Sequence, residues 1–327
     1  MLAVDLGYSA VKAVSEAKRV MMPSVVAPYR EGPLADLAGN GTGYDVSIRM
    51  SGESLRYFVG DLALREGQAA TFTLDREKHL HPNHDVLILA AARLLNAAPL
   101  ATLAVGLPVA YYKHQKDALR RHLENLSAEV CVQGGPWSRV SFGRVTVYPQ
   151  GAGALLTAPE LPKNGLVLLV DVGYKTTDFV TAEVASGMVR PVSALSGSVE
   201  TGVYDVDVAL AEAYGETTGA PVSMLRLREV ENDSGRICFY GRQIDLSGVL
   251  ENIKKEVAVS IIDQVRARLG DRAAFIRRAY LAGGGAYSLP QLASIFPVTS
   301  ILPEAQWANA LGYLKGVGQL EARRDKG

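Results

Sequence analysis

The sequence predicts an α/β protein with two domains, and three observations support this prediction. The chain has 327 residues, about twice the length of a usual domain. Apolar strand-like runs alternate along it with segments of helical periodicity. In addition, residues 4–8 read VDLGY and residues 170–174 read VDVGY, about half a chain length apart. A duplicated α/β unit explains both the length and the repeat.

The first half of the chain alternates strands and helices. Gly7 turns the first strand into the second, and Pro23 then opens a glycine-rich, polar stretch that we expect to be an inserted subdomain. Pro82 suits a helix start and Pro108 stops a buried strand. The expected strands are residues 1–4, 10–14, 19–22, 103–107, 130–132 and 140–148, and the expected helices are 82–96, 111–126 and a short small-residue helix after Pro149.

The second half begins with the most apolar strand of the chain, residues 166–170, which ends at Asp171. Apolar residues recur at helical spacing over residues 249–269, and Gly270 ends this helix. A polar segment up to Ile244 precedes it. The other expected elements are strands at 178–184, 188–195 and 280–282 and helices at 203–214 and 304–320.

Composition excludes several classes of protein. Lys plus Arg and Asp plus Glu both number 34, so the formal net charge is zero and no broad basic surface for direct nucleic-acid binding is expected. Cys131 and Cys238 form no CxxC pair, which argues against a zinc ribbon or an iron–sulfur cluster and fits a reducing cytoplasm. The apolar runs are far shorter than the roughly 18 residues of a membrane span. No basic segment precedes the first apolar run, so we expect a cytoplasmic protein without a secretory signal or membrane contact.

The repeated motif has a chemical meaning. Each copy places an aspartate at a strand end, followed by a glycine turn whose N–H groups can hold phosphate oxygens. Asp5 and Asp171 would supply hard oxygen to hydrated Mg²⁺, which prefers few carboxylates together with substrate phosphates. Two copies facing each other would clamp one triphosphate. The alternative is two ordinary hairpins, because the D-x-G pattern alone is common.

Five ordered motifs resemble those of the actin, Hsp70 and sugar-kinase superfamily. They cover nearly the whole chain. The chain length and the motif sequences are most similar to those of the compact prokaryotic and archaeal actin-like proteins of the ParM type. The motifs are DLGYSAVK at residues 5–12, PQGAGA at 149–154, DVGYKTTD at 171–178, LAGGGA at 281–286 and WANALGY at 307–313.

The resemblance implies a two-domain actin-like ATPase fold with the nucleotide in the interdomain cleft. Each domain would have a ribonuclease-H-like core sheet and an inserted subdomain. Domain I would comprise residues 1–157 plus 304–327, with its insert at about 24–74, and domain II would comprise residues 158–303, with its insert at about 203–244.

The function implied by the resemblance is that of a self-assembling filament protein. The protein would bind ATP or GTP with Mg²⁺ and hydrolyse the nucleotide. Its filaments would act in plasmid or DNA segregation through a DNA-binding adaptor, or in cytoskeletal positioning. The motifs do not discriminate ATP from GTP. A small-molecule kinase is an alternative, although no base for an acceptor hydroxyl can be identified. A chaperone-like or reactivating ATPase is another, although the chain ends soon after the last motif.

The resemblance also implies roles for individual residues. Gln150 would orient the attacking water, although it could instead cap a helix, and Asp171 would be the second catalytic residue. The expected metal-binding residues are Asp5, Asp171 and Asp178. Lys175 stands where many relatives have a small residue. The expected nucleotide-binding residues are Gly7, Tyr8, Ser9, Lys12, Gly173, Tyr174, Lys175, Thr176, Gly202, Gly283, Gly284, Gly285 and Tyr287.

One further cluster has the composition of a metal site. His79, His81 and His84 follow an HxHxxH pattern, but no cysteine or aspartate completes an evident ligand set, and Pro82 with Asn83 suits a helix start. The sequence leaves open whether these histidines bind anything.

Overall fold

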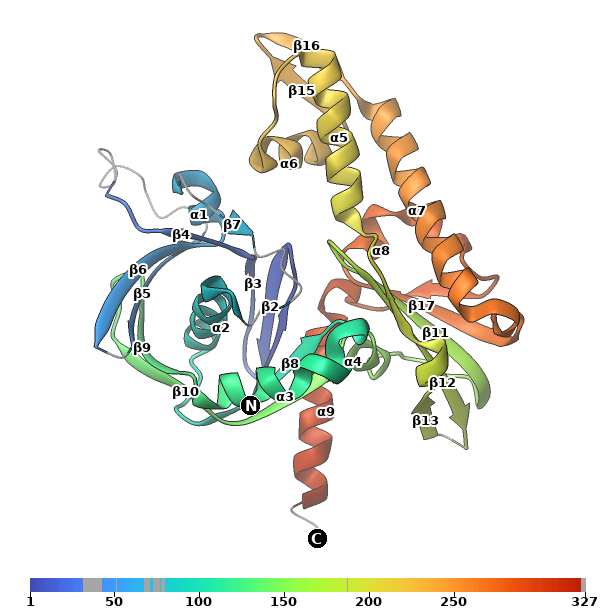
Figure 1. The fold of residues 1–327 in the computed structure, drawn as a ribbon. Coiled ribbons are helices and arrows are strands. Elements are labelled where there is room, and N and C mark those ends of the chain that lie inside the picture. The colour runs from blue at the N-terminus through green and yellow to red at the C-terminus, as the bar shows by residue number, and fades with distance from the viewer. Residues whose placement is uncertain are drawn as a thin grey trace. The chain divides into compact units, whose positions relative to one another are not determined.

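Buried apolar strands form two main sheets, and each sheet belongs to one of two units (Figure 1). The computed structural model describes residues 1–31, 43–50, 52–67, 71–72, 77, 80–186 and 188–324. Unit 1 comprises Met1–Thr157 and Trp307–Gly327, and unit 2 comprises Ala158–Gln306.

Unit 1 contains a ten-stranded sheet and its covering helices. Its strands are β1 (Leu2–Leu6), β2 (Ala10–Ser15), β3 (Arg19–Pro23), β4 (Val25–Pro28), β5 (Tyr44–Met50), β6 (Glu53–Val59), β7 (Thr71–Phe72), β8 (Ala101–Leu107), β9 (Ser127–Val132) and β10 (Ser138–Pro149). Its helices are α1 (Asp61–Glu66), α2 (Pro82–Leu94), α3 (Val109–Asn125), α4 (Ala152–Leu155) and α9 (Ala308–Arg324).

The strand order of unit 1 is β3-β2-β1-β8-β10-β9-β5-β6-β4-β7. β1, β2 and β3 are antiparallel neighbours. β8 runs parallel to β1, and β10 runs parallel to β8. The segment expected as an insert at about 24–74 supplies β4 to β7 and α1 in its described part. Because β5 pairs with β9, these strands extend the same sheet, which curves around α2 in Figure 1.

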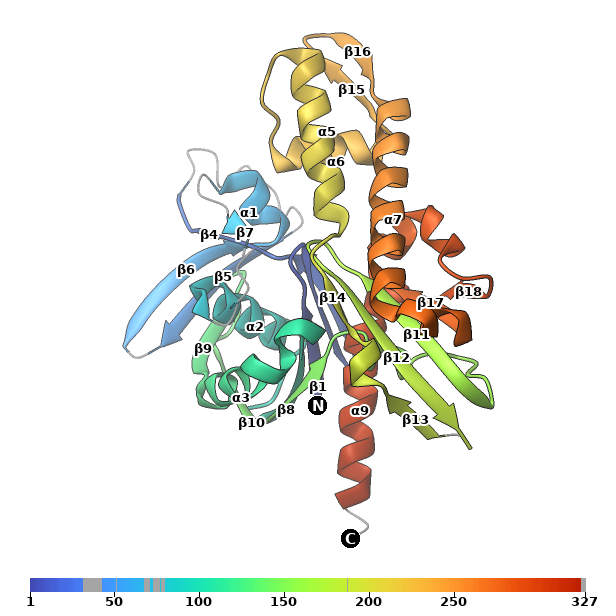
Figure 2. The ribbon, with the colours of Figure 1, turned by 45° about the vertical axis from the view of Figure 1, so that its right-hand side comes forward.

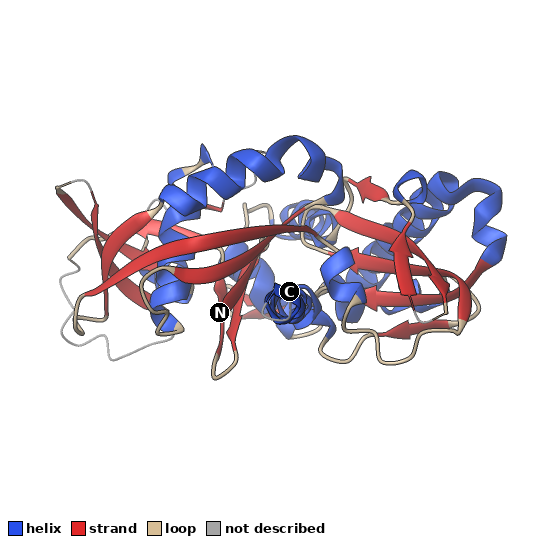
Figure 3. Ribbon diagram, turned by 90° about the horizontal axis from the view of Figure 1, so that it is seen from below, coloured by secondary structure: helices blue, strands red, loops and turns tan. Residues whose placement is uncertain are grey.

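The core of unit 1 lies on both faces of the sheet. The residues of α2 from Val86 to Ala92 are all buried, which is typical of a helix that is apolar on every side. They pack with β1 and β8 side chains such as Val4 and Leu103 in one cluster. On the opposite face Tyr313 of α9 packs with small strand residues such as Ala104. Figure 3 shows α9 end-on beside these strands.

Small residues let α4 and α9 approach closely. A Cβ on Gly312 would collide with the carbonyl oxygen of Gly153, and a Cβ on Gly153 would collide with the ring of Tyr313. This contact anchors the C-terminal helix to the residues that follow β10.

Unit 2 is organised around a six-stranded sheet. Its strands are β11 (Asn164–Val172), β12 (Thr177–Ala185), β13 (Met188–Pro191), β14 (Gly197–Val199), β17 (Ile276–Ala282) and β18 (Thr299–Ile301), with a separate hairpin of β15 (Arg236–Phe239) and β16 (Arg242–Asp245). Its helices are α5 (Val203–Thr218), α6 (Met224–Asn232), α7 (Ser247–Leu269) and α8 (Gly285–Ser288), with 3₁₀ turns η2 (Ser193–Leu195), η3 (Gly270–Phe275) and η4 (Pro290–Ser294). A further 3₁₀ turn, η5 (Ala305–Trp307), precedes α9.

The two sheets share a five-strand core. In unit 2 the order is β13-β12-β11-β17-β18, with β14 added beside β12. As in unit 1, the first three strands of this unit in chain order are antiparallel neighbours. β17 then runs parallel to β11 and β18 parallel to β17, as β8 and β10 follow β1 in unit 1. The sequence repeat at Asp5 and Asp171 is therefore a repeat of topology.

The elements between α5 and α7 differ most from the sequence prediction. The polar segment before Ile244 contains α6 and the β15–β16 hairpin, which Figure 2 shows beside α5 and α7. Tyr240 and Gly241 form the hairpin turn, both with positive φ. The predicted strand over 188–195 was too long, because β13 ends at Pro191 and a 3₁₀ turn follows. Of the apolar positions predicted to line α7, Leu250 and Val265 are buried, but Val249 is 42% exposed.

Among the ranges that the structure describes, every helix falls short of a membrane-spanning segment in length or in hydropathy.

Candidate nucleotide-binding site

The first aspartate turn joins β1 to β2. Gly7 donates its N–H to the carbonyl oxygen of Ala10 at 3.1 Å. A Cβ on Gly7 would lie 2.8 Å from that oxygen, so a larger residue would force the turn open. Ser24 holds the turn from outside, because its hydroxyl donates to the Gly7 carbonyl at 2.7 Å and its N–H donates to the Ser9 carbonyl at 2.9 Å.

The buried side chain of Asp5 has two partners in unit 1. Asp5 pairs across the strands with Lys12, and Lys12 Nζ lies 3.8 Å from Asp5 Oδ2. Gln150 Nε2 donates to Asp5 Oδ1 at 3.1 Å. The structure thus brings together three predicted site residues, of which Gln150 is far from Asp5 and Lys12 in the sequence.

Gln150 lies just before the short helix α4 rather than in it. Its N–H donates to the carbonyl of Leu107 at 2.8 Å, and Gly151 occupies the helix N-cap with φ 77°. Asn309 Oδ1 accepts the Gly151 N–H at 3.0 Å. Gln150 is only 8% exposed, and these backbone hydrogen bonds fix the direction of its side chain.

The second aspartate turn, between β11 and β12, has the same backbone. Gly173 donates its N–H to the carbonyl of Thr176 at 3.0 Å, and a Cβ on Gly173 would lie 2.8 Å from that oxygen. Here the N-terminus of α5 holds the turn. Val203 N–H donates to the Gly173 carbonyl at 3.2 Å, and Tyr204 N–H donates to the Tyr174 carbonyl at 2.7 Å.

The charges at the second turn differ from those at the first. Asp171 pairs directly with Asp178 across the two strands, and both residues are buried. Ser198 Oγ donates to one oxygen of Asp178 at 2.5 Å, and Thr176 Oγ1 lies 3.5 Å from the other. Directly opposed like charges destabilise a sheet unless a cation balances them. Two neighbouring carboxylates with hydroxyl groups are the oxygen-rich surroundings that suit Mg²⁺.

The glycine triplet at the end of β17 lies against the second turn. Gly283 has φ 81°, and a Cβ there would lie 2.6 Å from Asp171 Oδ1 and would collide with the Val172 carbonyl. A Cβ on Gly285 would collide with the Val172 side chain. The backbone of the LAGGGA motif therefore lies against the aspartate that begins the DVGYKTTD motif.

The remaining predicted nucleotide contacts lie around these two turns. Gly202 is the N-cap of α5, and its N–H donates to Asp205 at 2.8 Å. Tyr287 is 56% exposed, and its hydroxyl accepts the Ala305 N–H at 3.3 Å. Tyr8, on the first turn, is buried. Lys175 is partly exposed on the second turn, and Gly284 precedes α8.

Sequence reasoning missed Asp207, which lies behind the second turn. The Tyr174 hydroxyl donates to Asp207 Oδ2 at 2.6 Å, and the ring of Tyr174 packs edge-on against Tyr204. Burial raises the pKa of Asp207 above its ordinary value, and burial together with the nearby Asp207 charge raises the pKa of Tyr174. The sequence does hold a signal for Asp207. It lies at helical spacing with the buried residues Leu210 and Tyr214, so the pattern places this aspartate on the buried face of the predicted helix.

Ser24 and Ser198 were also missed. The Ser24 hydroxyl, between β3 and β4, reaches the first turn, and the Ser198 hydroxyl, on β14, reaches Asp178. Such contacts depend on strand pairing, and no local pattern marks them.

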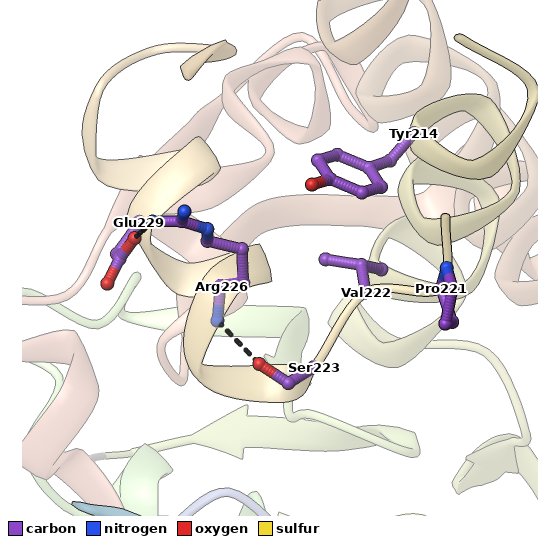
Figure 4. A pocket seen from close by; sticks show the side chains of 6 residues that line it. All are labelled: Tyr214, Pro221, Val222, Ser223, Arg226 and Glu229. Carbon is purple, nitrogen blue, oxygen red and sulfur yellow. Dashed lines mark hydrogen bonds and ion pairs between the residues drawn. The ribbon is translucent and has the colours of Figure 1, made fainter. Parts of the chain in front are cut away.

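A surface hollow between α5 and α6 has no part in these turns (Figure 4). Arg226 and Glu229 in its lining form an ion pair with each other at 2.5 Å, and Ser223 Oγ accepts the Arg226 N–H as an N-cap. The lining residues are Tyr214, Pro221, Val222, Ser223, Arg226 and Glu229, none of them a predicted site residue.

The HxHxxH pattern does not act as one cluster in the part of the chain that the structure describes. His81 caps α2, with its Nδ1 accepting the Asn83 N–H at 3.1 Å. His84 lies instead beside Asp85 and His122. His79 lies outside the described residues, as does most of the glycine-rich loop near residue 40.

Comparison with known families matches each half of the chain to an actin-like domain. Residues 3–153 match the family described as the N-terminal domain of actin-like proteins. Residues 169–294 match the C-terminal domain of the archaeal, MreB-like actin homologue. Archaeal actin homologues of Thermoplasma acidophilum and Thermoplasma volcanium are each 27% identical over 334 residues, covering 96% of this chain and 97% of the relative.

Solved structures agree with this assignment. A ParM filament structure from Clostridium botulinum is 25% identical, with a TM-score of 0.86, and covers 97% of this chain and 98% of that one. An archaeal actin homologue solved in complex with ADP is 24% identical, with a TM-score of 0.79, and covers 97% and 99% of the two chains. These matches confirm the fold predicted from the five motifs: the chain belongs to the actin-like superfamily and has the two-domain fold of the ParM-type and archaeal actin homologues.

Proposed function

We propose that this protein is a nucleotide-dependent, filament-forming actin homologue that binds and hydrolyses ATP or GTP with Mg²⁺. The observation that carries the proposal is the pair of equivalent aspartate turns, each at the end of the first strand of its unit. Membership of a family that includes ParM filaments supports self-association as the purpose of nucleotide binding.

The backbone of each turn suits a phosphate ligand. Gly7 and Gly173 bring the chain close to its own carbonyl oxygens, and short glycine turns of this kind can present N–H groups as an anion-binding concavity. The ADP complex of an archaeal actin homologue supports the assignment to a nucleotide. Gly202, Gly283 to Gly285 and Tyr287 are the proposed contacts to the nucleoside.

Asp171 and Asp178 are the proposed residues for Mg²⁺. Their direct pairing in a buried position suits a dication, which when bound neutralises charge on the phosphates. Asp5 already has Lys12 and Gln150 as partners, so we assign it to metal-bound water.

Gln150 is the proposed positioning residue for the attacking water. Hydrolysis needs a water held in line with the terminal phosphorus rather than a covalent nucleophile. The amide of Gln150 is held by its hydrogen bond to Asp5 and by the backbone bond to Leu107, so little freedom is lost when it orients water. Lys12 and Lys175 would contribute positive charge to phosphate oxygens.

Cargo would be attached indirectly. A net charge of zero does not suit broad binding of the chain to DNA, so a role in plasmid segregation requires a DNA-binding adaptor. Cytoskeletal positioning requires a different adaptor but the same filament.

The test is light scattering of the purified protein with Mg²⁺ and ATP, GTP or ADP, with phosphate release followed in the same sample. We expect scattering to rise with a triphosphate and to decay as phosphate appears. Electron microscopy of the same samples should show filaments only during the scattering phase.

Two other results would replace the proposal. Hydrolysis without scattering, stimulated many-fold by a sugar or a short acid, would indicate a small-molecule kinase. Hydrolysis without scattering and without such stimulation would indicate a chaperone-like ATPase. Assembly that is equal with and without nucleotide would contradict the nucleotide dependence.

A further inference from the structure

Three potential metal ligands meet in unit 1 away from the aspartate turns. His84 and Asp85 lie in the first turn of α2, and His122 lies in the last turn of α3. Asp85 Oδ1 is 2.7 Å from His122 Nε2 and 3.1 Å from His84 Nδ1. All three ligand atoms lie within 4.8 Å of one another.

These distances are close to those of a coordinated ion. Three ligands held about 2.1 Å from a tetrahedral metal ion are separated by roughly 3.4 Å. Small rotations of Asp85 and His122 would therefore make room for an ion without moving the helices. The backbone of α2 is fixed by the apolar core on every side, so the ligands on this helix are preorganised.

The three side chains are buried to different degrees. The side chain of His84 is 6% exposed, that of Asp85 is 21% exposed and that of His122 is 35% exposed. A buried ligand anchors the cluster, and the partly exposed ones leave a path for an ion to enter and a position for water.

We propose that His84, Asp85 and His122 form a binding site for a divalent transition-metal ion of the zinc type. Two imidazole nitrogens and one carboxylate oxygen suit Zn²⁺ or Co²⁺, whereas Mg²⁺ and Ca²⁺ prefer oxygen ligands alone. The ion would replace the contacts between the imidazoles and Asp85 by three coordinate bonds, release any proton on the coordinating nitrogens, and join α2 to α3. This site is separate from the proposed Mg²⁺ site in residues, in unit and in metal preference.

The experiment is a titration of the untagged, metal-free full-length protein with Co²⁺ and then with Zn²⁺. We expect visible ligand-field absorption that saturates at one Co²⁺ per chain and is removed by Zn²⁺. In thermal unfolding, Zn²⁺ at about a hundredfold above its dissociation constant should raise the midpoint by roughly 5 °C.

Matched variants identify the ligands. His122→Gln and Asp85→Asn should lose the Co²⁺ absorption and the thermal shift while keeping the far-ultraviolet circular dichroism of the parent. His114→Gln changes an exposed histidine on the same helix and should keep both signals. Asp171→Asn should also keep both, because it alters the proposed nucleotide site only.

Three results would overturn the proposal. These are absence of saturable Co²⁺ binding in the parent, equal binding in His122→Gln and His114→Gln, and loss of Co²⁺ binding in Asp171→Asn alone. In the first case the cluster is a hydrogen-bonded His–Asp–His network that ties α2 to α3.

Discussion

The two aspartate turns have the same backbone, but the residue that faces the aspartate across the strands is basic in one and acidic in the other. In each, a glycine N–H closes the turn onto a carbonyl three residues later, at 3.1 Å in the first and 3.0 Å in the second. The residue opposite the aspartate is Lys12 in unit 1 and Asp178 in unit 2. An acidic and a basic residue thus face each other at the first turn, and two acidic residues face each other at the second. The two turns keep one backbone geometry, which we propose holds phosphate, while one cross-strand position separates the proposed water-positioning half from the proposed metal-binding half.

The largest effect that tests this comparison is expected at Asp171. Asp171→Asn removes one of two opposed carboxylates and should slow phosphate release by about 10²–10³-fold, because the proposed ion loses a charged ligand. Asp5→Asn should slow it only about tenfold, since Lys12 already balances Asp5. Single-turnover phosphate release measures both.

Asp117→Asn, an exposed change on α3, serves as the control and should match the parent. Equal rates of phosphate release in the Asp5 and Asp171 variants would contradict the proposed difference between the two turns.

The contact between Gly283 and Asp171 is tested by stability. Gly283→Ala should lower the free energy of unfolding by roughly 3 kcal/mol, because it combines a positive φ with a Cβ in the space beside Asp171. Gly219→Ala has a similar φ of 69° but an open surrounding, and should cost about 1 kcal/mol. Urea unfolding of the two variants separates backbone strain from contact. Equal losses would show that the glycine triplet does not press on the second turn.

Gln150 tests the first turn. Gln150→Ala should reduce phosphate release about 10²-fold while leaving nucleotide affinity unchanged, because the amide acts on water rather than on the nucleotide. Binding of a fluorescent nucleotide and single-turnover hydrolysis measure the two quantities. Gln133→Ala, an exposed change in the same unit, is the control. A fall in affinity with an unchanged rate constant would assign Gln150 to binding instead.

The smallest effect concerns the support behind the second turn. The pKa of Asp207 is raised by burial, so the folded protein keeps this proton over a pH range where the unfolded chain has lost it. The free energy of unfolding should therefore fall as the pH rises from about 4 through the raised pKa. Asp207→Asn should remove this contribution, with a change below about 1 kcal/mol at low pH because Asn still accepts the Tyr174 hydroxyl.

Urea unfolding at several pH values from about 4 to about 7 measures the slope. Asp263→Asn on the exposed face of α7 should leave it unchanged. An identical slope in the Asp207 variant would show that Tyr174 and Asp207 are not linked to folding in this way.

Local patterns predicted most of the regular elements. The apolar run before Asp171 became β11, and the periodic segment before Gly270 became α7. The prediction failed where the pattern is weak. The segment before Ile244 is polar, and its α6 and hairpin are short elements without a strong apolar period. The stretch after Pro23 is predicted to be an inserted subdomain, and no local pattern in it indicates that its strand β5 pairs with β9 far along the chain.

The sequence by itself determined the duplicated strand and turn, the glycines that the turns require, and the buried helix α2, because each depends on neighbouring residues. The tertiary structure decided that Lys12 faces Asp5 while Asp178 faces Asp171, that Gly283 touches Asp171, and that His122 meets His84. These contacts follow from strand register and helix packing, which join residues far apart in the chain. A periodic pattern specifies which face of an element is buried, but the partner on the other side is selected only when the whole sheet and its helices pack together.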